Sequence, residues 1–365
     1  MKYLSEYRDK DTVERLLREI KKTVTKPWTL MEICGGQTHS LVKNGILDMI
    51  FPEITMVHGP GCPVCVTPVE MIDKAVSLAE QGYTICSFGD MLRVPGSEKS
   101  LLRAKASGAR IQIVYSPLEA IQYARKHPEE QVIFFAVGFE TTAPANALAV
   151  IIAEKQSLYN FSLLVSHVLV PPAMEGILND QYSVIDAFLA AGHVCSVMGY
   201  DQYHPIAERH MIPIIVTGFE PVDLLKGILA AVVQLESGQY RVQNEYARVV
   251  SEKGNRKAVS LINKVFEVAD RNWRGIGTIP KSGLELRKRF EQFDASKKFS
   301  LSTAVLSENN AGCQAGKILT GQIKPPDCSH FGRTCTPVNP LGAPMVSSEG
   351  ACAAYYHFHQ EKETV

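Results

Sequence analysis

The stretch Val132-Ile-Phe-Phe-Ala-Val-Gly-Phe-Glu-Thr-Thr-Ala-Pro144 decides the fold, because it holds a strand, a turn and the start of a helix. Its apolar run, Val132–Val137, is typical of a buried strand, and a helical pattern follows over 143–156. The turn is most simply a capped helix start, although Glu140 stands at a strand's carboxyl end, where α/β folds keep their sites.

The same alternation of apolar runs and helical patterns continues along the chain and predicts an α/β fold with parallel sheets. The other expected strands are 29–33, 54–57, 84–88, 111–114, 162–165, 194–198 and 214–216. The other expected helices are 11–23, 68–81, 98–107, 117–127, 173–190, 221–236 and 243–269.

Three regions are expected. The run Gly82–Asp90 resembles Gly192–Asp201, which suggests two related α/β domains. After residue 270 strand patterns fade, and Gly, Pro, Ser and Cys dominate 312–348. Such a segment needs cross-links such as an inorganic cluster, because it has few apolar residues with which to build a core. The expected regions are two parallel-sheet domains over 1–127 and 128–236 and a helical and loop region over 237–365.

Composition indicates an ordinary globular protein. Lys plus Arg equals Asp plus Glu, 38 against 38, so bulk charge gives no reason to expect nucleic acid or an anionic membrane as partner. The N-terminus lacks the apolar core of a signal peptide, and no apolar run is long enough to cross a bilayer. We therefore expect a cytoplasmic protein, in which cysteines serve metal binding or redox chemistry more often than structural disulfides.

Four cysteines in the last region have the number required for a metal centre, with the spacing Cys313-x14-Cys328-x6-Cys335-x16-Cys352. Four thiolates bind either zinc or an iron–sulfur cluster. Zinc sites usually contain two close CxxC pairs, and this segment has none, so the wide spacing favours a [4Fe–4S] cluster. Cys352 is expected to open a helix, whose amide dipoles stabilise a thiolate.

Cys62-Pro-Val-Cys65 has the spacing of a redox-active dithiol. It follows an expected strand and precedes an expected helix, as thioredoxin-type motifs do, and the helix N-terminus favours a thiolate. Half of a zinc site is the alternative, but the chain has no second CxxC.

Cys34-Gly-Gly-Gln-Thr-His39 follows the strand at 29–33, which places Cys34 at the carboxyl edge of a parallel sheet. The two glycines let backbone approach a bound group closely. His39 is a candidate base, metal ligand or hydrogen-bond donor, with a structural donor as the alternative. Cys86 and Cys195 lie in apolar patterns and are expected to be inert core residues.

Together these motifs resemble the HypD family of [NiFe]-hydrogenase maturation proteins. The resemblance rests on Cys34–His39, Gly59-Pro-Gly-Cys-Pro-Val-Cys65, Gly138-Phe-Glu-Thr-Thr-Ala-Pro144 and the four-cysteine tail, and it covers nearly the whole chain. The family often has His where this chain has Gln37.

The resemblance implies a partner, a cofactor and a cargo. HypD proteins pair with the chaperone HypC and scaffold an iron atom carrying two cyanides and one carbon monoxide, Fe(CN)2CO. The cyanide comes from HypE with HypF, and the hydrogenase large subunit is the destination. The resemblance makes Cys34 the iron ligand, Cys62 and Cys65 a redox pair, and the four tail cysteines, Cys313, Cys328, Cys335 and Cys352, ligands of a [4Fe–4S] cluster.

We therefore expect a scaffold in which a cluster feeds electrons to the Cys62/Cys65 pair and through it to iron at Cys34. One alternative is a cluster-dependent disulfide reductase similar to ferredoxin–thioredoxin reductase, which would not require Cys34. Another is a zinc-stabilised binding module.

Overall fold

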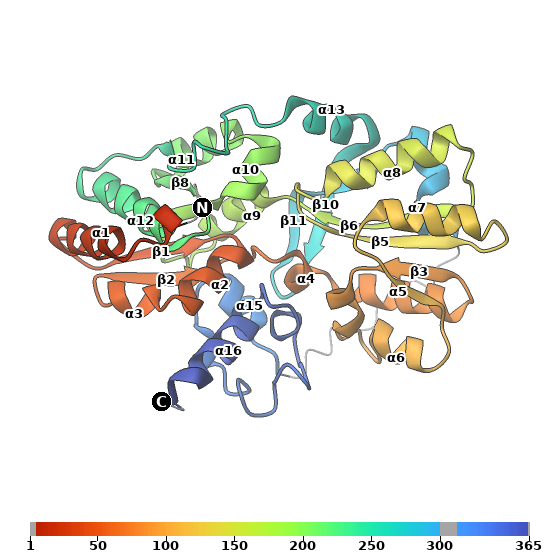
Figure 1. Cartoon of the computed structure of the whole chain (residues 1–365), viewed down its shortest axis with the longest axis horizontal. Helices are drawn as coiled ribbons and strands as arrows, with labels where there is room; N and C mark the ends of the chain where they lie inside the picture. Colours follow the sequence, from red (N-terminus) through yellow and green to blue (C-terminus); the bar gives the residue numbers. More distant parts are fainter. Residues whose placement is uncertain (1–4, 300–311, 364–365) are drawn as a thin grey trace.

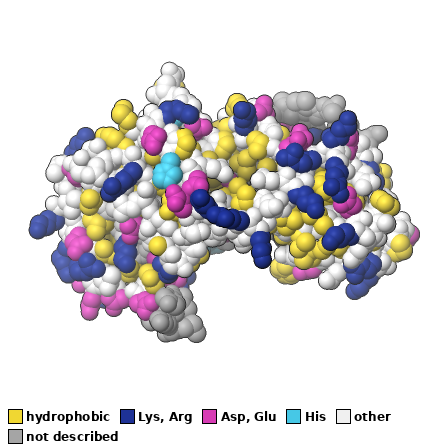
Figure 2. All heavy atoms as spheres, turned by 90° about the horizontal axis from the view of Figure 1, so that it is seen from above, with side chains coloured by type: hydrophobic (Ala, Val, Ile, Leu, Met, Phe, Trp, Pro, Cys, Tyr) yellow, Lys and Arg dark blue, Asp and Glu magenta, His cyan; other side chains and the backbone are white. Residues whose placement is uncertain are grey.

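The computed structural model describes residues 5–299 and 312–363. Two lobes, each built on one sheet with helices on both faces, lie side by side (Figure 1). The C-terminal segment, blue in Figure 1, lies beneath them. A waist separates the lobes in Figure 2, and Lys and Arg side chains are scattered over both among Asp and Glu. None of the helices in the described ranges is both long and apolar enough to cross a membrane.

The first sheet is entirely parallel, with the order β2-β1-β7-β8-β9. Alternate residues of its strands face two apolar cores: Leu30 packs toward one and Met31 toward the other. The strands are β1 (Trp28–Glu32), β2 (Ile54–His58), β7 (Ala187–Ala191), β8 (Ile214–Thr217) and β9 (Val242–Asn244). The helices over one face are α1 (Lys10–Thr23), α2 (Gly35–Lys43), α3 (Ile46–Ile50) and α12 (Pro221–Glu236), and those over the other are α9 (Val170–Leu178), α10 (Gly192–Met198) and α11 (His204–His210).

The second sheet has the order β10-β11-β6-β5-β3-β4 and is parallel except at β10 and β11. Its strands are β3 (Thr84–Ser87), β4 (Ile111–Ile113), β5 (Val132–Gly138), β6 (Phe161–Val168), β10 (Phe266–Trp273) and β11 (Gly277–Leu286). The helices α5 (Val69–Glu80) and α6 (Leu101–Ala106) cover one face, and α7 (Pro117–Lys126), α8 (Ala143–Lys155) and α13 (Arg256–Val265) cover the other.

The short helices α4 (Pro63–Val66), α14 (Ala295–Lys298) and α15 (Ala315–Leu319) and the longer α16 (Ala351–Glu363) complete the α-helices of the described ranges.

The predicted fold class is confirmed: the structure is α/β with two mainly parallel sheets. Each sheet takes strands from separate parts of the chain. The first combines 28–58 with 187–244, and the second combines 84–168 with 266–286. The expected limits near residues 127 and 236 therefore do not separate one sheet from the other.

The prediction for residues 173–198 was wrong in part. The helix α9 ends at Leu178, Ala187–Ala191 forms the strand β7, and the expected strand 194–198 is the helix α10. Alanine and leucine favour helices, but β7 is buried on both faces between β1 and β8, and tertiary burial overrides that propensity. The similarity of 82–90 to 192–201 does not extend to structure, since the first segment forms β3 and the second forms α10.

The prediction for 243–269 and for the segment after 270 was also wrong in part. Only Arg256–Val265 is helical, with Asn255 as its N-cap, and a long antiparallel hairpin of β10 and β11 follows. Pro280 and Gly283 weaken the strand pattern of β11, and the pairing shifts register between Ala269 and Arg271. These irregularities hid the hairpin from pattern reading.

Candidate functional site

Cys34 lies where the strand order of the first sheet reverses. The chain moves from β1 to β2 on one side, whereas β7 leads to β8 and β9 on the other. Ligands of open α/β sheets bind in the crevice at such a switch point, outside the carboxyl ends of the strands. Cys34 follows β1 as the N-cap residue of α2, and His193 follows β7 in the first turn of α10. Their side chains meet, with Cys34 Sγ 3.6 Å from His193 Nδ1.

Burial controls the protonation of this pair. It raises the pKa of the Cys34 thiol well above its usual range, and the carboxylates of Glu32 and Glu349 add to the shift. Backbone N–H groups at Gln37 and Gly36 offset part of it. Burial also lowers the pKa of His193 to about 4, so its imidazole is neutral at physiological pH. A neutral imidazole beside a protonated thiol can accept the thiol proton or serve as a second metal ligand.

The CxxC loop packs directly against Cys34. Gly35 N–H donates to Gly61 C=O at 3.1 Å, and a Cβ added at Gly61 would lie 2.2 Å from Cys34 N. Only glycine permits this approach. Cys62 and Cys65 form a disulfide at the start of α4, and they are 3% and 0% exposed. The predicted dithiol is thus adjacent to Cys34 in space, inside the fold.

His39 lies on α2 but faces the C-terminal segment. Its Nδ1 is 3.3 Å from Ser348 O, and its ring makes an edge-on contact with Phe358 of α16. The imidazole that contacts the Cys34 thiol is that of His193. A chemical role for His39 stays a prediction, while its contacts are those of a donor that docks α16 on α2. Gln37 has a similar docking role, because its Nε2 donates to the carbonyls of Ala190 and Thr217 at the ends of β7 and β8.

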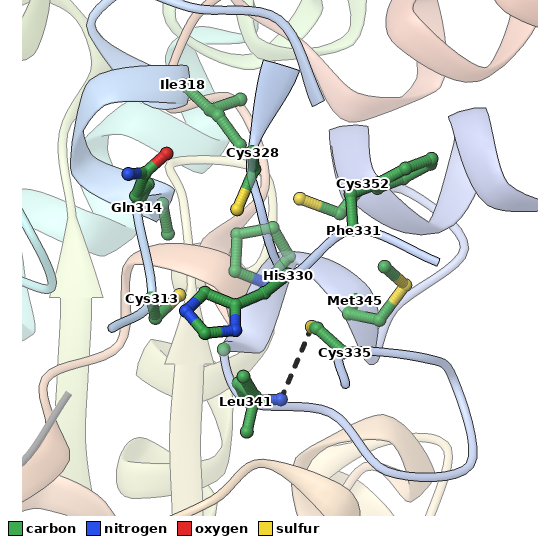
Figure 3. A pocket seen from close by; sticks show the side chains of 13 residues that line it. Cys313, Gln314, Ile318, Cys328, His330, Phe331, Cys335, Leu341, Met345 and Cys352 are labelled. Atoms are coloured by element: carbon green, nitrogen blue, oxygen red, sulfur yellow. Dashed lines mark hydrogen bonds between the residues drawn. The ribbon is translucent and has the colours of Figure 1, made fainter. Parts of the chain in front are cut away.

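The four tail cysteines line one cavity and point into it from separate segments (Figure 3). Cys313 precedes α15, Cys328 ends the 3-10 helix η5 (Pro325–Asp327), and Cys352 lies in the first turn of α16, as predicted. Cys335 Sγ accepts a hydrogen bond from Leu341 N at 3.4 Å. The sequence therefore identified residues that the fold brings together over a span of 40 positions.

The geometry of this cavity fits a cluster better than a single zinc ion. Among the residues that the structure describes, no three of these Sγ atoms lie within 4.8 Å of one another. A tetrahedral zinc with Zn–S bonds of about 2.3 Å would require sulfur separations of about 3.8 Å. Wider thiolate corners suit a four-iron cube.

Burial favours the neutral thiols in this cavity, so a metal that binds there would have to displace their protons. Burial raises the pKa of Cys352 well above its usual value, and the charges of the other three thiols raise it further. Burial raises the pKa of Cys313 as well. Thiolates gathered in an apolar cavity repel one another unless metal charge compensates them.

The helix that carries Cys65 contacts a segment that lines the four-cysteine cavity. The helix α4, which carries Cys65, packs against the 3-10 helix η6 (Ala343–Met345). Pro344 and Met345 of η6 line the cysteine cavity. The CxxC loop therefore lies between the four-cysteine cavity on one side and Cys34 on the other.

The remaining candidates behave largely as core residues. Cys86 and Cys195 are fully buried, as predicted, and burial raises the pKa of each to about 12. Cys195 lies in the helix α10 rather than in a strand. Glu140 is 3% exposed, its Oε1 accepts from Val170 N–H at 2.9 Å, and burial raises its pKa to about 7.

Comparison with known proteins shows the family of this chain. The profile of the HypD family, described as the hydrogenase formation hypA family, matches residues 11–359. The chain belongs to the HypD family. The hydrogenase maturation factor HypD of Rhodobacter capsulatus is 45% identical over 98% of both chains. That of Azotobacter vinelandii is 43% identical over 100% of this chain and 99% of its own. That of Escherichia coli K12 is 42% identical over 99% of each.

Sequence reasoning missed several side chains around Cys34 in this HypD-family chain. His193 was not singled out, because the strand β7 before it was taken for part of a helix and a strand was expected at 194–198 instead of the helix α10. Glu32 and His58 end neighbouring strands and hydrogen-bond each other at 2.7 Å, a contact set by the pairing of β1 and β2. Glu349, in the C-terminal segment, packs its backbone against Gly35, and its charge raises the pKa of the Cys34 thiol. The one sequence signal that could have identified such residues is a polar side chain at the carboxyl end of an expected parallel strand.

Proposed function

We propose that this chain is a hydrogenase maturation factor that holds an iron atom at Cys34 while cyanide and carbon monoxide are attached to it. Its curated HypD relatives carry the name of such factors. The observation that carries the proposal is the place of Cys34. Its thiol is buried at the switch point of the first sheet, and the neutral imidazole of His193 lies 3.6 Å away. The loop that carries the Cys62–Cys65 disulfide packs against its backbone.

Cys34 and His193 would act together on the incoming iron. The thiol must lose its proton to bind metal, and burial opposes the bare thiolate. His193 is positioned to accept that proton through Nδ1, or to bind the iron itself once Cys34 has done so. Cyanide and carbon monoxide favour low-spin Fe(II), which soft thiolate ligands suit. A thiolate from the chaperone HypC would supply a further ligand.

Once reduced to the dithiol, Cys62 and Cys65 would pass electrons to the iron at Cys34. Closing the dithiol to the disulfide releases two electrons and two protons, and opening it takes up the same number. The four tail cysteines, Cys313, Cys328, Cys335 and Cys352, would hold a [4Fe–4S] cluster, which when bound supplies single electrons on the far side of the α4–η6 contact. The cyanide donor would be HypE with HypF.

The alternative of a protein disulfide reductase has weaker support. Such an enzyme must present its dithiol to the disulfide of another protein. Cys62 and Cys65 are 3% and 0% exposed, and their loop faces Cys34 rather than the surface. A small iron site within the fold suits this placement better than a protein substrate.

Mössbauer spectroscopy of 57Fe-labelled protein purified with HypC tests the proposal. We expect the signal of a four-iron cluster and a separate low-spin Fe(II) signal. Cys34→Ala should lose only the low-spin iron, and Cys335→Ser should lose the cluster signal. Cys195→Ala is the matched control, because it removes a buried thiol from the same lobe. Protein that contains zinc and no iron would refute the cluster.

A further inference from the structure

A buried hydrogen-bond network joins Cys34 to the helix that carries Cys352. Glu32, which is 0% exposed, accepts the backbone N–H of Cys34 on Oε2 at 2.8 Å. On Oε1 it accepts from the Thr38 hydroxyl and from His58 Nδ1, the latter at 2.7 Å. His58 Nε2 lies 2.9 Å from the hydroxyl of Tyr355 in α16. Every side chain in this network is buried.

The network has a defined polarity. A carboxylate only accepts hydrogen bonds, so His58 presents a proton on Nδ1 to Glu32. In the neutral ring Nε2 is then an acceptor, and the Tyr355 hydroxyl donates to it. Glu32 thus fixes the tautomer of His58, and Tyr355 helps to hold the orientation of its ring, much as outer hydrogen-bond partners do for histidines at metal sites. Without that donor the Nε2 acceptor loses its hydrogen bond inside the protein, and of these two hydrogen bonds the ring keeps only that to Glu32.

Tyr355 lies three residues after Cys352, on the neighbouring turn of α16. Binding of metal by Cys352 would hold the first turn of this helix in place, and with it the Tyr355 hydroxyl. His39 of α2 also contacts Phe358 of α16 and Ser348, which precedes that helix, but the His39 side chain is only half-buried. The Tyr355–His58–Glu32 path is fully inside the protein and ends at the Cys34 backbone.

We propose that Tyr355, His58 and Glu32 are positioning residues that couple metal occupancy of the four-cysteine cavity to the geometry of Cys34. The inference rests on the proposed metal centre but not on which metal fills it, nor on iron at Cys34. With the cavity filled, Cys34 is held in its buried position. With the cavity empty, α16 loosens, His58 loses its donor, and the Cys34 backbone is released.

The test is the rate at which iodoacetamide alkylates Cys34 in the full chain, followed by peptide mass spectrometry. Metal-loaded protein without cargo iron is compared with protein stripped by a chelator under reducing conditions. Because one buried hydrogen bond is at stake, we expect alkylation of Cys34 to be about fivefold to tenfold faster after stripping. In Tyr355→Phe, Cys34 should be alkylated equally fast in metal-loaded and stripped protein, at about the rate of the stripped parent chain. His58→Gln should keep part of the metal effect, because an amide still donates and accepts.

Tyr356→Phe is the matched control, since it removes a hydroxyl from the next position of α16 that makes no hydrogen bond within the described ranges. It should behave as the parent chain. Alkylation of Cys86, read in the same digest, reports global unfolding, and only a change in the Cys34 to Cys86 ratio counts. If Tyr355→Phe fails to retain metal, His58→Gln and His58→Phe, which lie outside the cavity, carry the comparison.

Coupling is refuted if stripping leaves the Cys34 rate unchanged, or if Tyr355→Phe and His58→Phe remain as sensitive to metal as the parent chain. Failure of the proposed function would not change this result, because the assay contains neither iron at Cys34 nor the ligands of that iron. A zinc-filled cavity would overturn the cluster and still allow the coupling to be measured.

Discussion

Gly61→Ala should separate iron chemistry at Cys34 from the stability of the fold. A Cβ at Gly61 would lie 2.2 Å from Cys34 N, 2.4 Å from Cys34 Cα and 2.4 Å from Ile33 C. These are backbone atoms at the end of β1, and they cannot turn aside as a side chain can. The contact falls short of an ordinary 3.4 Å separation by more than 1 Å. The CxxC loop must therefore move away from Cys34 by about that distance.

The expected effect is large on chemistry and moderate on folding. A misplacement of about 1 Å at a reacting group costs about a hundredfold in rate. The same overpacking should lower the free energy of unfolding by about 1–3 kcal/mol. The four-cysteine cavity lies beyond the α4–η6 contact and should still bind its metal.

The assay is the rate at which infrared bands of iron-bound cyanide and carbon monoxide appear when the protein is loaded with HypC and the cyanide donor. Urea unfolding and metal content are measured on the same samples. Gly176→Ala is the control, because the nearest atoms to its Cβ belong to the Ile279 side chain and lie no closer than an ordinary 3.5 Å contact. Bands that appear in Gly61→Ala at the parent rate would refute the placement of the CxxC loop beside the reacting iron.

Three further predictions follow from the same geometry. Burial raises the pKa of Glu140 to about 7, so its neutral form stabilises the fold below about pH 4.5, and about 3 kcal/mol is lost as pH rises through 7. Glu140→Gln should not lose this stability when the free energy of urea unfolding is compared at about pH 5 and about pH 8. The prediction is contradicted if the free energy of unfolding changes with pH in the same way in the variant and in the parent chain. His193→Ala should slow iron uptake at neutral pH about a hundredfold, with recovery as pH rises, because the Cys34 thiol loses its nearby base; a pH-independent defect in stopped-flow uptake would argue against that role. Gly342→Ala would place a Cβ 2.3 Å from Cys313 Sγ, so iron content and the EPR signal of the reduced cluster should fall by more than half. Full cluster occupancy in this variant would contradict the claim that the four-cysteine cavity holds the cluster.

The sequence predicted those parts of the fold whose physical signal is local. Strands such as β5 were recognisable because a parallel strand covered on both faces is a continuous apolar run. The tail cysteines were recognisable because four thiols in a Gly- and Pro-rich segment have few other uses. The strand β7 was missed because its alanines and leucine suit a helix equally well, and only its neighbours β1 and β8 decide the matter.

The partners of Cys34 were beyond sequence reasoning for a different reason. His193 meets Cys34 across 159 positions because β1 pairs with β7, and Tyr355 meets His58 across 297 because α16 returns to the first sheet. Neither contact has a local pattern. The position of Cys34 at a strand end was predictable, and the identity of the groups around it depended on the topology.

The most direct test of the account is the infrared spectrum of the chain purified anaerobically with HypC, compared with that of Cys34→Ala. The account predicts stretching bands of iron-bound cyanide and carbon monoxide in the parent chain and in Cys195→Ala, and none in Cys34→Ala. Unchanged bands in Cys34→Ala, in protein that retains its metal centre and its stability, would contradict the claim that Cys34 holds the iron.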